Sequence, residues 1–350
     1  MILSNSNIYT FLKYLEVIFF TGVILYFGKS LFIPLFFGLL VAIIMYPACK
    51  WLEQKGWLKS IAIGAVLGIV TIIFATLLWL LIWQLQLFRQ DLPGLTQKLE
   101  TNLPVLQTWI ERNFGFSITW QNDFLQNSAS VNNISNLLKG TLNNTINTLF
   151  YLVIVPVFSA LFLYHRRTFV RYLQLIAGRE YLHQLSSILR QTTHTYFNFI
   201  KGMLMVYVVV GILNSIGLMA LGIKHAILFG MLTAIMTIIP YIGIIVSALL
   251  PITVAWITKD SIWYPIGVIA VFAFVQYLEA NVIFPMIVGT QLNVSTWATL
   301  VAFIAGGILW GVAGMILFIP FVAILKIVAD NVEDWKPLDI LLNRTPDLKG

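Results

Sequence analysis

A single carboxylate, Glu279, stands inside the longest apolar stretch of this chain, Ser261–Lys326. The nearest acidic residues on either side of it are Asp260 and Asp330. A charged side chain at the centre of a membrane helix costs roughly 2.5–3.5 kcal/mol on insertion scales. Such a carboxylate can bind a cation, exchange a proton or contact a substrate. It can also hydrogen-bond a neighbouring helix in a purely structural role, and both interpretations are open at this point.

Three amide side chains are candidates to share a site with Glu279. Gln276 lies three residues earlier and on the same helical face. Asn281, two residues later, lies about 200° around an unbroken helix and points elsewhere unless the helix is interrupted there. Asn214, in an earlier apolar span, can line a pathway or hydrogen-bond a neighbouring helix. We predict Glu279, Gln276, Asn281 and Asn214 as the transport or coupling residues.

The elements that position these residues belong to a membrane protein. Hydrophobic residues make up 59% of the chain and charged residues only 10%, whereas soluble domains carry about 25% charged residues. The mean hydropathy is +0.89. Apolar runs recur from end to end, so the sequence predicts an all-α polytopic membrane protein.

Several chemical functions lack their signatures. The single cysteine, Cys49, excludes an internal disulfide and a cysteine-based metal cluster. The sequence contains neither a phosphate-binding GxxxxGK[ST] motif nor an HExxH motif, and no pair of aspartates lies inside the spans. We therefore expect no enzyme activity, no cofactor, no metal site and no nucleic-acid partner.

The distribution of basic residues predicts the orientation of the chain. Lysines and arginines exceed acids in 49–60 and in 165–201, whereas positive and negative charges balance in 89–146. The positive-inside rule places the first two segments in the cytoplasm and the third outside. Both termini are then expected in the cytoplasm.

Apolar runs and their breaks divide the chain into six expected parts. They are N-terminal membrane helices at 1–88, extracytoplasmic amphipathic helices at 89–146, a membrane helix and a basic cytoplasmic helix at 147–197, two transport repeats at 198–258 and 259–326, and a cytoplasmic tail at 327–350. The amphipathic helices can fold on each other or on the lipid surface, or they can form a subunit interface or a cap over a pathway. We expect the interface, and hence a homo-oligomer.

Each repeat is expected to contain a full span and then a broken hairpin. The uncharged segment 226–258 has 33 residues and would be about 50 Å long as one helix, too long for a hydrocarbon core of about 30 Å. Two half-helices that meet at Pro240–Gly243 fit better, and 296–326 poses the same problem. The residues predicted as helix breaks and hinges are Pro240, Gly243, Pro285, Gly289, Gly306, Gly307 and Pro320. If each half-helix of the two broken hairpins is counted, about eight segments enter the membrane. Broken segments at corresponding positions of two repeats indicate a transport site between the repeats.

Several motifs together resemble one known family. They are "YFNFIKGM" at 196–203, "GILNSIGLMALGI" at 211–223, "IPYIG" at 239–243, a Q-x-x-E-x-N-x-x-x-P pattern at Gln276, Glu279, Asn281 and Pro285, and a glycine-rich stretch that ends in Pro320 and Lys326. The chain resembles the autoinducer-2 exporter family of bacterial membrane permeases over nearly its whole length. It departs from the family pattern at Met286, where members often carry a basic residue, and in "LNVSTW" at 292–297.

The resemblance implies a secondary transporter of the bacterial cytoplasmic membrane that exports small polar molecules such as autoinducer-2. Some members are described as sodium or lithium/proton antiporters, so a monovalent cation and a proton are alternative partners. A third alternative, of another class, is a non-transporting membrane scaffold in which Glu279 is structural.

Overall fold

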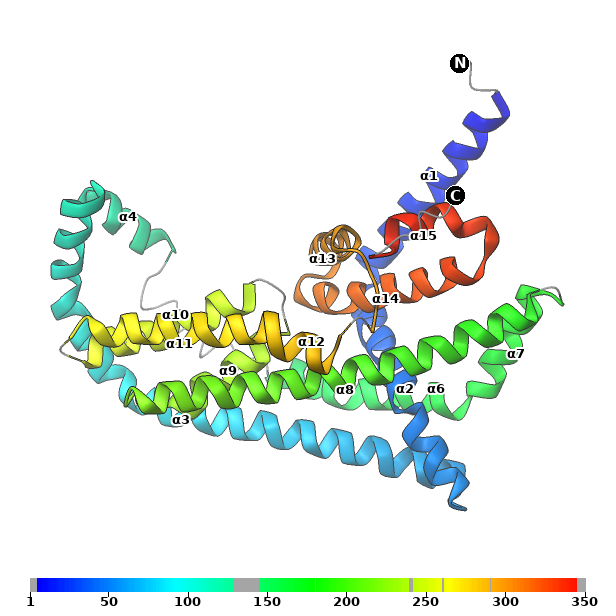
Figure 1. Ribbon diagram of the computed structural model, residues 1–350, viewed down its shortest axis with the longest axis horizontal. Helices are drawn as coiled ribbons and strands as arrows, with labels where there is room; N and C mark the ends of the chain where they lie inside the picture. The colour runs from blue at the N-terminus through cyan, green and yellow to red at the C-terminus, as the bar shows by residue number, and fades with distance from the viewer. Residues whose placement is uncertain are drawn as a thin grey trace. The chain divides into compact units, whose positions relative to one another are not determined.

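The computed structural model describes residues 5–128, 145–179, 181–238, 242–259, 261–289 and 291–344. Nearly all of them lie in helices (Figure 1). The helices are α1 (Asn5–Phe27), α2 (Lys29–Gln54), α3 (Lys59–Phe114), α4 (Ile118–Ser128), α6 (Thr145–Tyr164), α7 (Arg166–Ala177), α8 (Leu182–Ala220), α9 (Ala226–Met236), α10 (Ile242–Thr258), α11 (Trp263–Leu278), the π-helix η1 (Glu279–Ile283), α12 (Phe284–Ile287), α13 (Thr296–Trp310), α14 (Val312–Asn331), the 3-10 helix η2 (Glu333–Trp335) and α15 (Lys336–Leu342). Within these ranges the only β-type pairing is an isolated bridge, Val294–Asn343. The predicted all-α class is confirmed.

Several helices have the length and composition of membrane spans. Among the described residues these are Lys29–Gln54, Lys59–Phe88, Leu182–Ala220, Trp263–Ile287 and Val312–Asn331. A sixth span results if α6 and α7, which are bent by 64° at their junction, count as one. The apolar helices α9, α10 and α13 are shorter. The protein is therefore a multi-pass membrane protein, while the number of about eight membrane segments stays a prediction.

The predicted boundary between membrane and outer segment, at 88/89, does not coincide with a helix end. Helix α3 runs unbroken for 56 residues and contains Pro93 and Pro104. Beyond its end, α4 folds back onto it, because Gln107 Nε2 donates to Asn122 Oδ1 at 2.6 Å and Gln121 Nε2 donates to the Gln107 carbonyl at 3.2 Å. The second amphipathic stretch expected in this region falls mostly on 129–144, outside the described residues.

The chain divides into two compact units. The first comprises Met1–Thr71, Val153–Lys201 and Thr290–Gly350, and the second comprises Ile72–Leu152 and Gly202–Gly289. This division differs from the predicted repeats, because the first hairpin and Glu279 belong to the second unit, whereas the second hairpin belongs to the first. The repeats themselves stay a prediction.

In the first unit, contacts join segments 49–60 and 165–201, both of which the distribution of basic residues predicts to be cytoplasmic. Arg166, at the start of α7, forms an ion pair with Glu53, at the end of α2. Lys59 Nζ donates a hydrogen bond to the Tyr164 carbonyl. The ends of α2 and α6 and the start of α3 therefore lie on the same side of this unit.

The second hairpin consists of α13 and α14, and it turns at Gly311. This residue has φ +60° and ψ −140°, a conformation that side chains with a Cβ rarely adopt. The predicted breaks Gly306 and Gly307 were wrong: both lie inside α13. Gly306 has another role, since a Cβ on it would lie 2.4 Å from the Gly314 carbonyl oxygen. The glycine pair lets the two arms approach closely.

The first hairpin consists of α9 and α10. Helix α9 ends at Met236 and α10 begins at Ile242, and Pro240 lies outside the described residues. Gly243 is not in the gap but in the first turn of α10. A Cβ there would lie 1.8 Å from the Met236 carbonyl oxygen, so this glycine permits the close return of the chain.

Two of the predicted proline breaks were also wrong. Pro320 lies inside α14, where its carbonyl accepts a hydrogen bond from the Tyr196 hydroxyl. Pro285 lies at the start of α12, within a span that continues from Trp263 to Ile287. The wider π turn before it accommodates the proline without interrupting the span. Gly289, with φ +59°, lies just beyond the end of α12 at Ile287, and its N–H donates to the Phe284 carbonyl at 3.0 Å. Its role as a hinge stays a prediction.

Candidate functional site

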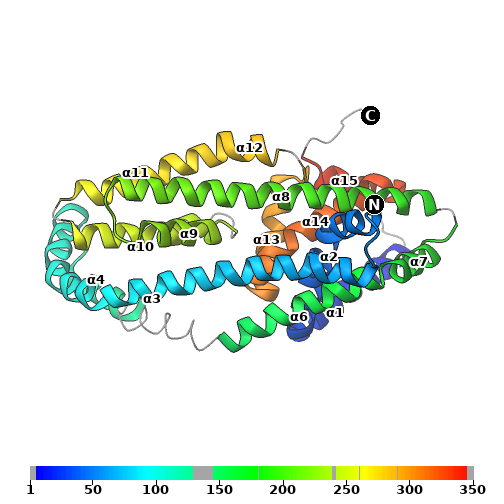
Figure 2. The same cartoon turned by 90° about the horizontal axis from the view of Figure 1, so that it is seen from below.

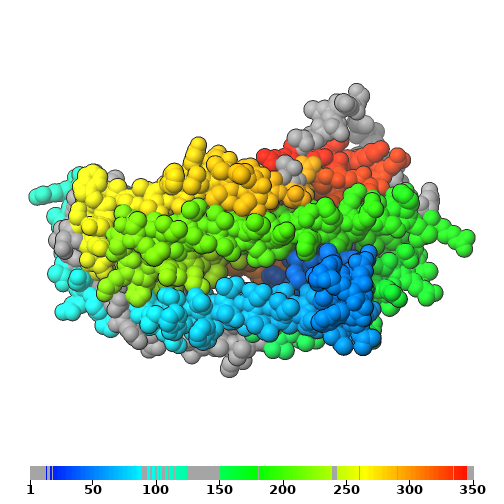
Figure 3. Space-filling model, turned by 60° about the horizontal axis from the view of Figure 1, so that its bottom comes forward, coloured from blue at the N-terminus to red at the C-terminus, as the bar shows by residue number. Residues whose placement is uncertain are grey.

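The candidate site lies in the second unit, where α8 runs antiparallel to α11, η1 and α12 (Figure 2). The register is fixed at two glycines of α8. Gly202 packs against the backbone of Ile287 and Val288, and Gly217 packs against the Val271 side chain. Figure 3 shows the two helices adjoining along one face. Glu279 lies on the second of them, between these two contact points in sequence.

The first hairpin packs against another face of α8 through small residues. A Cβ on Gly230 of α9 would lie 1.9 Å from Ser215 Oγ and 2.5 Å from the Gly211 carbonyl oxygen. Gly211 in turn lies against the Ala234 side chain. Small residues four apart on both helices allow this close approach. Helix α8 is therefore held by α9 on one side and by α11–α12 on the other.

Glu279 begins the π-helix η1. Its side chain is half-buried, and its Oε2 atom is buried with no hydrogen-bond partner among the described residues. A buried carboxylate oxygen without a donor is costly, so such a group usually serves a purpose other than stability. π-Helical turns are frequent at functional sites. Pro285 adds to this local irregularity, because it has no N–H to donate back to the preceding turn.

The two amides nearest in sequence to Glu279 behave differently. Gln276 is half-buried one turn earlier on α11, and no hydrogen bond joins it to Glu279 in the described part of the chain. Asn281 is exposed, and its Nδ2 donates to the Tyr277 carbonyl at 2.9 Å. Among the described residues, neither amide is therefore bonded to the carboxylate, and Asn281 bonds to its own helix instead.

Asn214 is completely buried on α8. Its Nδ2 donates to the Val210 carbonyl at 2.9 Å, while its Oδ1 is buried without a partner among the described residues. The side chain does not bond to Glu279. Among the described residues of this unit's membrane helices, Asn214 Oδ1 and Glu279 Oε2 are the two buried side-chain atoms without a hydrogen-bond partner.

Tyr207 is a site residue that the sequence analysis missed. It lies on α8, and its phenol is close enough to the Glu279 carboxylate for the two groups to interact electrostatically. Tyr207 and Asn214 are seven residues apart, so they share one face of the helix. This seven-residue spacing within one apolar span was the sequence signal that could have identified Tyr207 as a partner of Asn214. The candidate site thus consists of Glu279 and Gln276 on one helix, with Tyr207 and Asn214 on α8.

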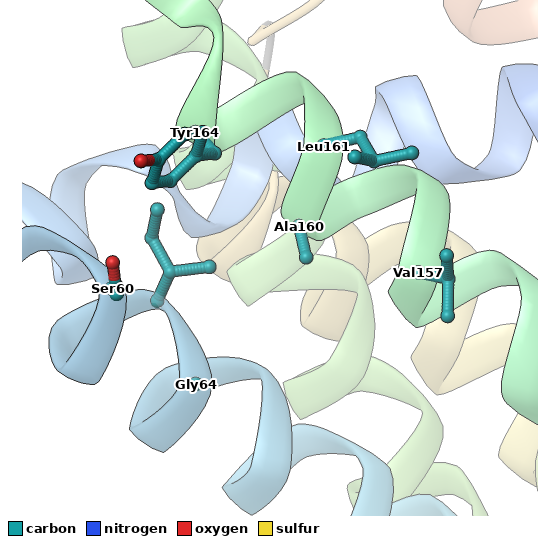
Figure 4. Close-up of a pocket in the computed structure, with 7 residues that line it drawn as sticks. Ser60, Gly64, Val157, Ala160, Leu161 and Tyr164 are labelled. Carbon is teal, nitrogen blue, oxygen red and sulfur yellow. The ribbon is translucent and has the colours of Figure 1, made fainter.

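A groove elsewhere in the molecule does not match this site. It lies in the first unit, between α3 and α6, and has a volume of about 340 Å³ (Figure 4). Its lining residues are Ser60, Ile63, Gly64, Val157, Ala160, Leu161 and Tyr164. None of the predicted transport residues lines it. Its mainly apolar wall suits a lipid chain better than a polar solute.

Comparison with known proteins agrees with the membrane architecture. The family model described as AI-2E family transporter matches residues 15–334. The chain belongs to the AI-2E transporter family. The match includes both hairpins, the π-helix and all four residues of the candidate site.

Relatives in this family align over most of their lengths. The chain is 24% identical to the putative transport protein YrrI of Bacillus subtilis over 311 residues. This alignment covers 85% of this chain and 86% of the relative. It is 26% identical to the putative transport protein YueF of the same organism, over 83% of this chain and 82% of the relative. It is 21% identical to the AI-2 transport protein TqsA of Escherichia coli, over 91% of this chain and 90% of the relative. The names of these relatives agree with the family model, which identifies the chain as a transporter.

Proposed function

We propose that this transporter exports a small polar solute of the AI-2 type across the bacterial cytoplasmic membrane, with Glu279 as the group that couples export to an ion gradient. Membership in the AI-2E family supports transport, and the name of the relative TqsA supports the solute class. A furanose-like solute carries hydroxyl groups and no large apolar surface. The hydroxyl, amide and carboxyl groups of Tyr207, Asn214 and Glu279 have the hydrogen-bonding capacity to accept such a solute.

The observation that carries this proposal is the unsatisfied Oε2 of Glu279 in a π-helical turn of a membrane span. A structural glutamate would be expected to have both oxygens hydrogen-bonded, because an unmade buried hydrogen bond costs about 1–3 kcal/mol and more for a charged group. An oxygen without a donor is available to a proton, a cation or a solute hydroxyl.

Reconstitution into liposomes tests the proposal. Purified protein would be given a pH or sodium gradient, and uptake of a labelled small polyol or furanose would be measured together with a pH-sensitive dye. We expect solute flux that depends on the gradient. Solute flux without any gradient dependence would remove the coupling role, and the absence of solute flux would refute the solute class.

A monovalent cation/proton antiporter is the second candidate, and the same oxygen atom favours it. A carboxylate that alternately holds a proton and a sodium or lithium ion would exchange the two without a solute. The dye assay separates the candidates, since an antiporter changes the internal pH when sodium or lithium alone is added. If neither cation nor solute flux occurs, the scaffold alternative gains support.

Assembly and topology complete the proposal. We propose a homo-oligomer in which the extension of α3 beyond the membrane, together with α4, forms contacts outside the membrane. Light scattering in mild detergent tests this assembly, and a monomeric mass would refute it.

The proposed topology keeps both termini in the cytoplasm, on the side of the Glu53–Arg166 ion pair. Cysteine accessibility at Trp57 and at Phe116, both exposed, tests this topology.

A further inference from the structure

The groove between α3 and α6 is polar at one end and apolar along the rest of its length (Figure 4). The Tyr164 phenol and the Ser60 hydroxyl lie together at the polar end. Val157 and Leu161, farther along the wall, are both exposed, so the groove opens away from the core of the unit. A molecule that fits this groove is therefore apolar over most of its length and polar at one end.

The floor of the groove is part of the core of the first unit. Ile63 is buried in one hydrophobic cluster with Leu163, and Ala160 packs against the same cluster. On the α3 side the groove is lined by Gly64, where a Cβ would meet no atom within 4 Å. A larger side chain at this position would narrow the groove. Its volume of about 340 Å³ lies within the range of ligand pockets.

Two cations flank the polar end of the groove. Lys59 Nζ donates a hydrogen bond to the Tyr164 carbonyl and lies 5.0 Å from the centroid of the Tyr164 ring. Arg167, on the first turn of α7, is exposed and follows Tyr164 by three residues. Three residues of chain span at most about 11 Å, so both side chains can reach the same bound group.

The helices around the groove supply no negative charge to offset these cations. Helices α6 and α7 contain no acidic residue, and the first acidic residue of α3 is Asp91. The carboxylate of Glu53 is ion-paired with Arg166. Neither Lys59 nor Arg167 forms an ion pair with any residue that the structure describes. The polar end of the groove therefore attracts an anion.

Helix α7 indicates that this anion is met at the membrane surface. It is bent by 64° from α6, and none of its 12 residues is buried. Arg167 and Arg171 lie on one face of α7. Exposed apolar side chains at three- and four-residue steps form another face: Phe169, Tyr172, Leu173 and Ile176. A basic amphipathic helix of this kind lies in the plane of the membrane interface, where anionic headgroups gather on the cytoplasmic side.

We propose that the α3–α6 groove binds one anionic phospholipid, with an acyl chain along the apolar wall and the phosphate beside Lys59 and Arg167. Both cations form charge-assisted hydrogen bonds with phosphate oxygens. The hydroxyls of Ser60 and Tyr164 donate to the remaining phosphate and ester oxygens. This lipid site is separate from the candidate site around Glu279, so it does not depend on which solute or ion the protein carries.

Native mass spectrometry of the full-length protein in mild detergent measures lipid binding. Phosphatidylglycerol and phosphatidylcholine with the same acyl chains serve as probes, and the ratio of their Kd values for the first bound lipid gives the headgroup preference. Each cation near an anionic headgroup contributes about fivefold, so we expect phosphatidylglycerol to bind about tenfold more tightly or better. Equal Kd values for the two lipids would overturn the proposal.

Substitutions at the polar end identify the cations responsible. Lys59→Gln and Arg167→Gln should each lower the preference about fivefold, whereas Lys59→Arg should retain it. The matched control is Lys55→Gln, since Lys55 Nζ lies over the Trp51 ring at 3.6 Å and the residue does not line the groove. If Lys59→Gln is not recovered as a folded protein, Arg167→Gln at its exposed position gives the same test. An equal loss in Lys55→Gln and Arg167→Gln would show diffuse attraction to a basic surface and would overturn the site.

Substitutions along the apolar wall test the seat of the acyl chain. Gly64→Leu should weaken the binding of both lipids several-fold and leave their ratio unchanged. Gly68→Leu is the matched control, because a Cβ on Gly68 also meets no atom within 4 Å but this residue does not line the groove. The same spectra report the number of subunits. If Gly64→Leu alters that number and leaves lipid binding unchanged, the groove holds a second copy of the chain and the proposal is overturned.

Discussion

The close contact between the arms of the second hairpin predicts a large effect of one methyl group at Gly314. A Cβ on this residue would lie 2.0 Å from the Gly306 carbonyl oxygen and 2.6 Å from its carbonyl carbon. Both are backbone atoms, so no side-chain rotation can relieve the overlap. The two arms of the hairpin would have to separate by more than about 1 Å. Overpacking of this kind typically costs about 1–3 kcal/mol.

Gly68→Ala is the matched control. This glycine lies inside α3, and a Cβ on it would meet no atom within 4 Å. Because alanine favours a helix over glycine by about 0.8–1 kcal/mol, the control should leave stability unchanged or raise it. In Gly314→Ala the same gain is present but is outweighed by the overlap.

Thermal unfolding of the purified protein in detergent would measure the difference. With a net cost of about 2 kcal/mol and an entropy of unfolding of about 2.1 cal/mol/K per residue, we expect the Tm of Gly314→Ala to fall by about 3 °C, while that of Gly68→Ala stays level or rises. Equal Tm values for Gly314→Ala and the unmodified protein would refute the hairpin packing. So would a rise of the kind expected for the control.

Three further substitutions test the helix contacts and the site. Tyr196→Phe removes the hydroxyl bonded to the Pro320 carbonyl and should cost about 1–2 kcal/mol, visible as a lower Tm with little change in transport rate per folded protein. Asn214→Leu removes a buried oxygen that has no partner in the described part of the chain, and it should maintain or raise the Tm while reducing solute flux several-fold; unchanged flux would remove Asn214 from the site. Tyr207→Phe should preserve folding and shift the pH dependence of flux, because the phenol and the Glu279 carboxylate interact electrostatically; an unaltered pH profile would show that this interaction has no role in transport.

Local rules were sufficient to predict the helical class and the position of the breaks in outline. Composition and apolar run lengths predicted the membrane helices, and the length of 296–326 against bilayer thickness predicted a hairpin. The turn indeed lies between α13 and α14. The sequence could not predict which glycine forms the turn, because 305–314 contains four glycines. Only the packing between arms assigns Gly306 and Gly314 to close contact and leaves Gly311 for the turn.

The remaining errors arise from contacts or registers that no local pattern encodes. Pro285 has the sequence signal of a helix break, but a π turn just before it keeps the span continuous. Tyr207 is 72 residues from Glu279 along the chain, and only the antiparallel pairing of α8 with α11–α12 brings them together. Asn281 matches the family motif, yet it bonds to its own helix and lies away from the carboxylate.

The coupling role of Glu279 is tested most directly by Glu279→Gln in liposomes. This substitution keeps the size of the side chain and its capacity for hydrogen bonds but removes the exchangeable charge, so folding and membrane insertion should be retained. With an imposed pH or sodium gradient and a pH-sensitive dye, we predict that gradient-coupled transport falls at least tenfold, and that Glu279→Asp retains part of it. Native transport by a correctly folded Glu279→Gln protein, or failure of that protein to fold, would contradict the account and assign the carboxylate a structural role.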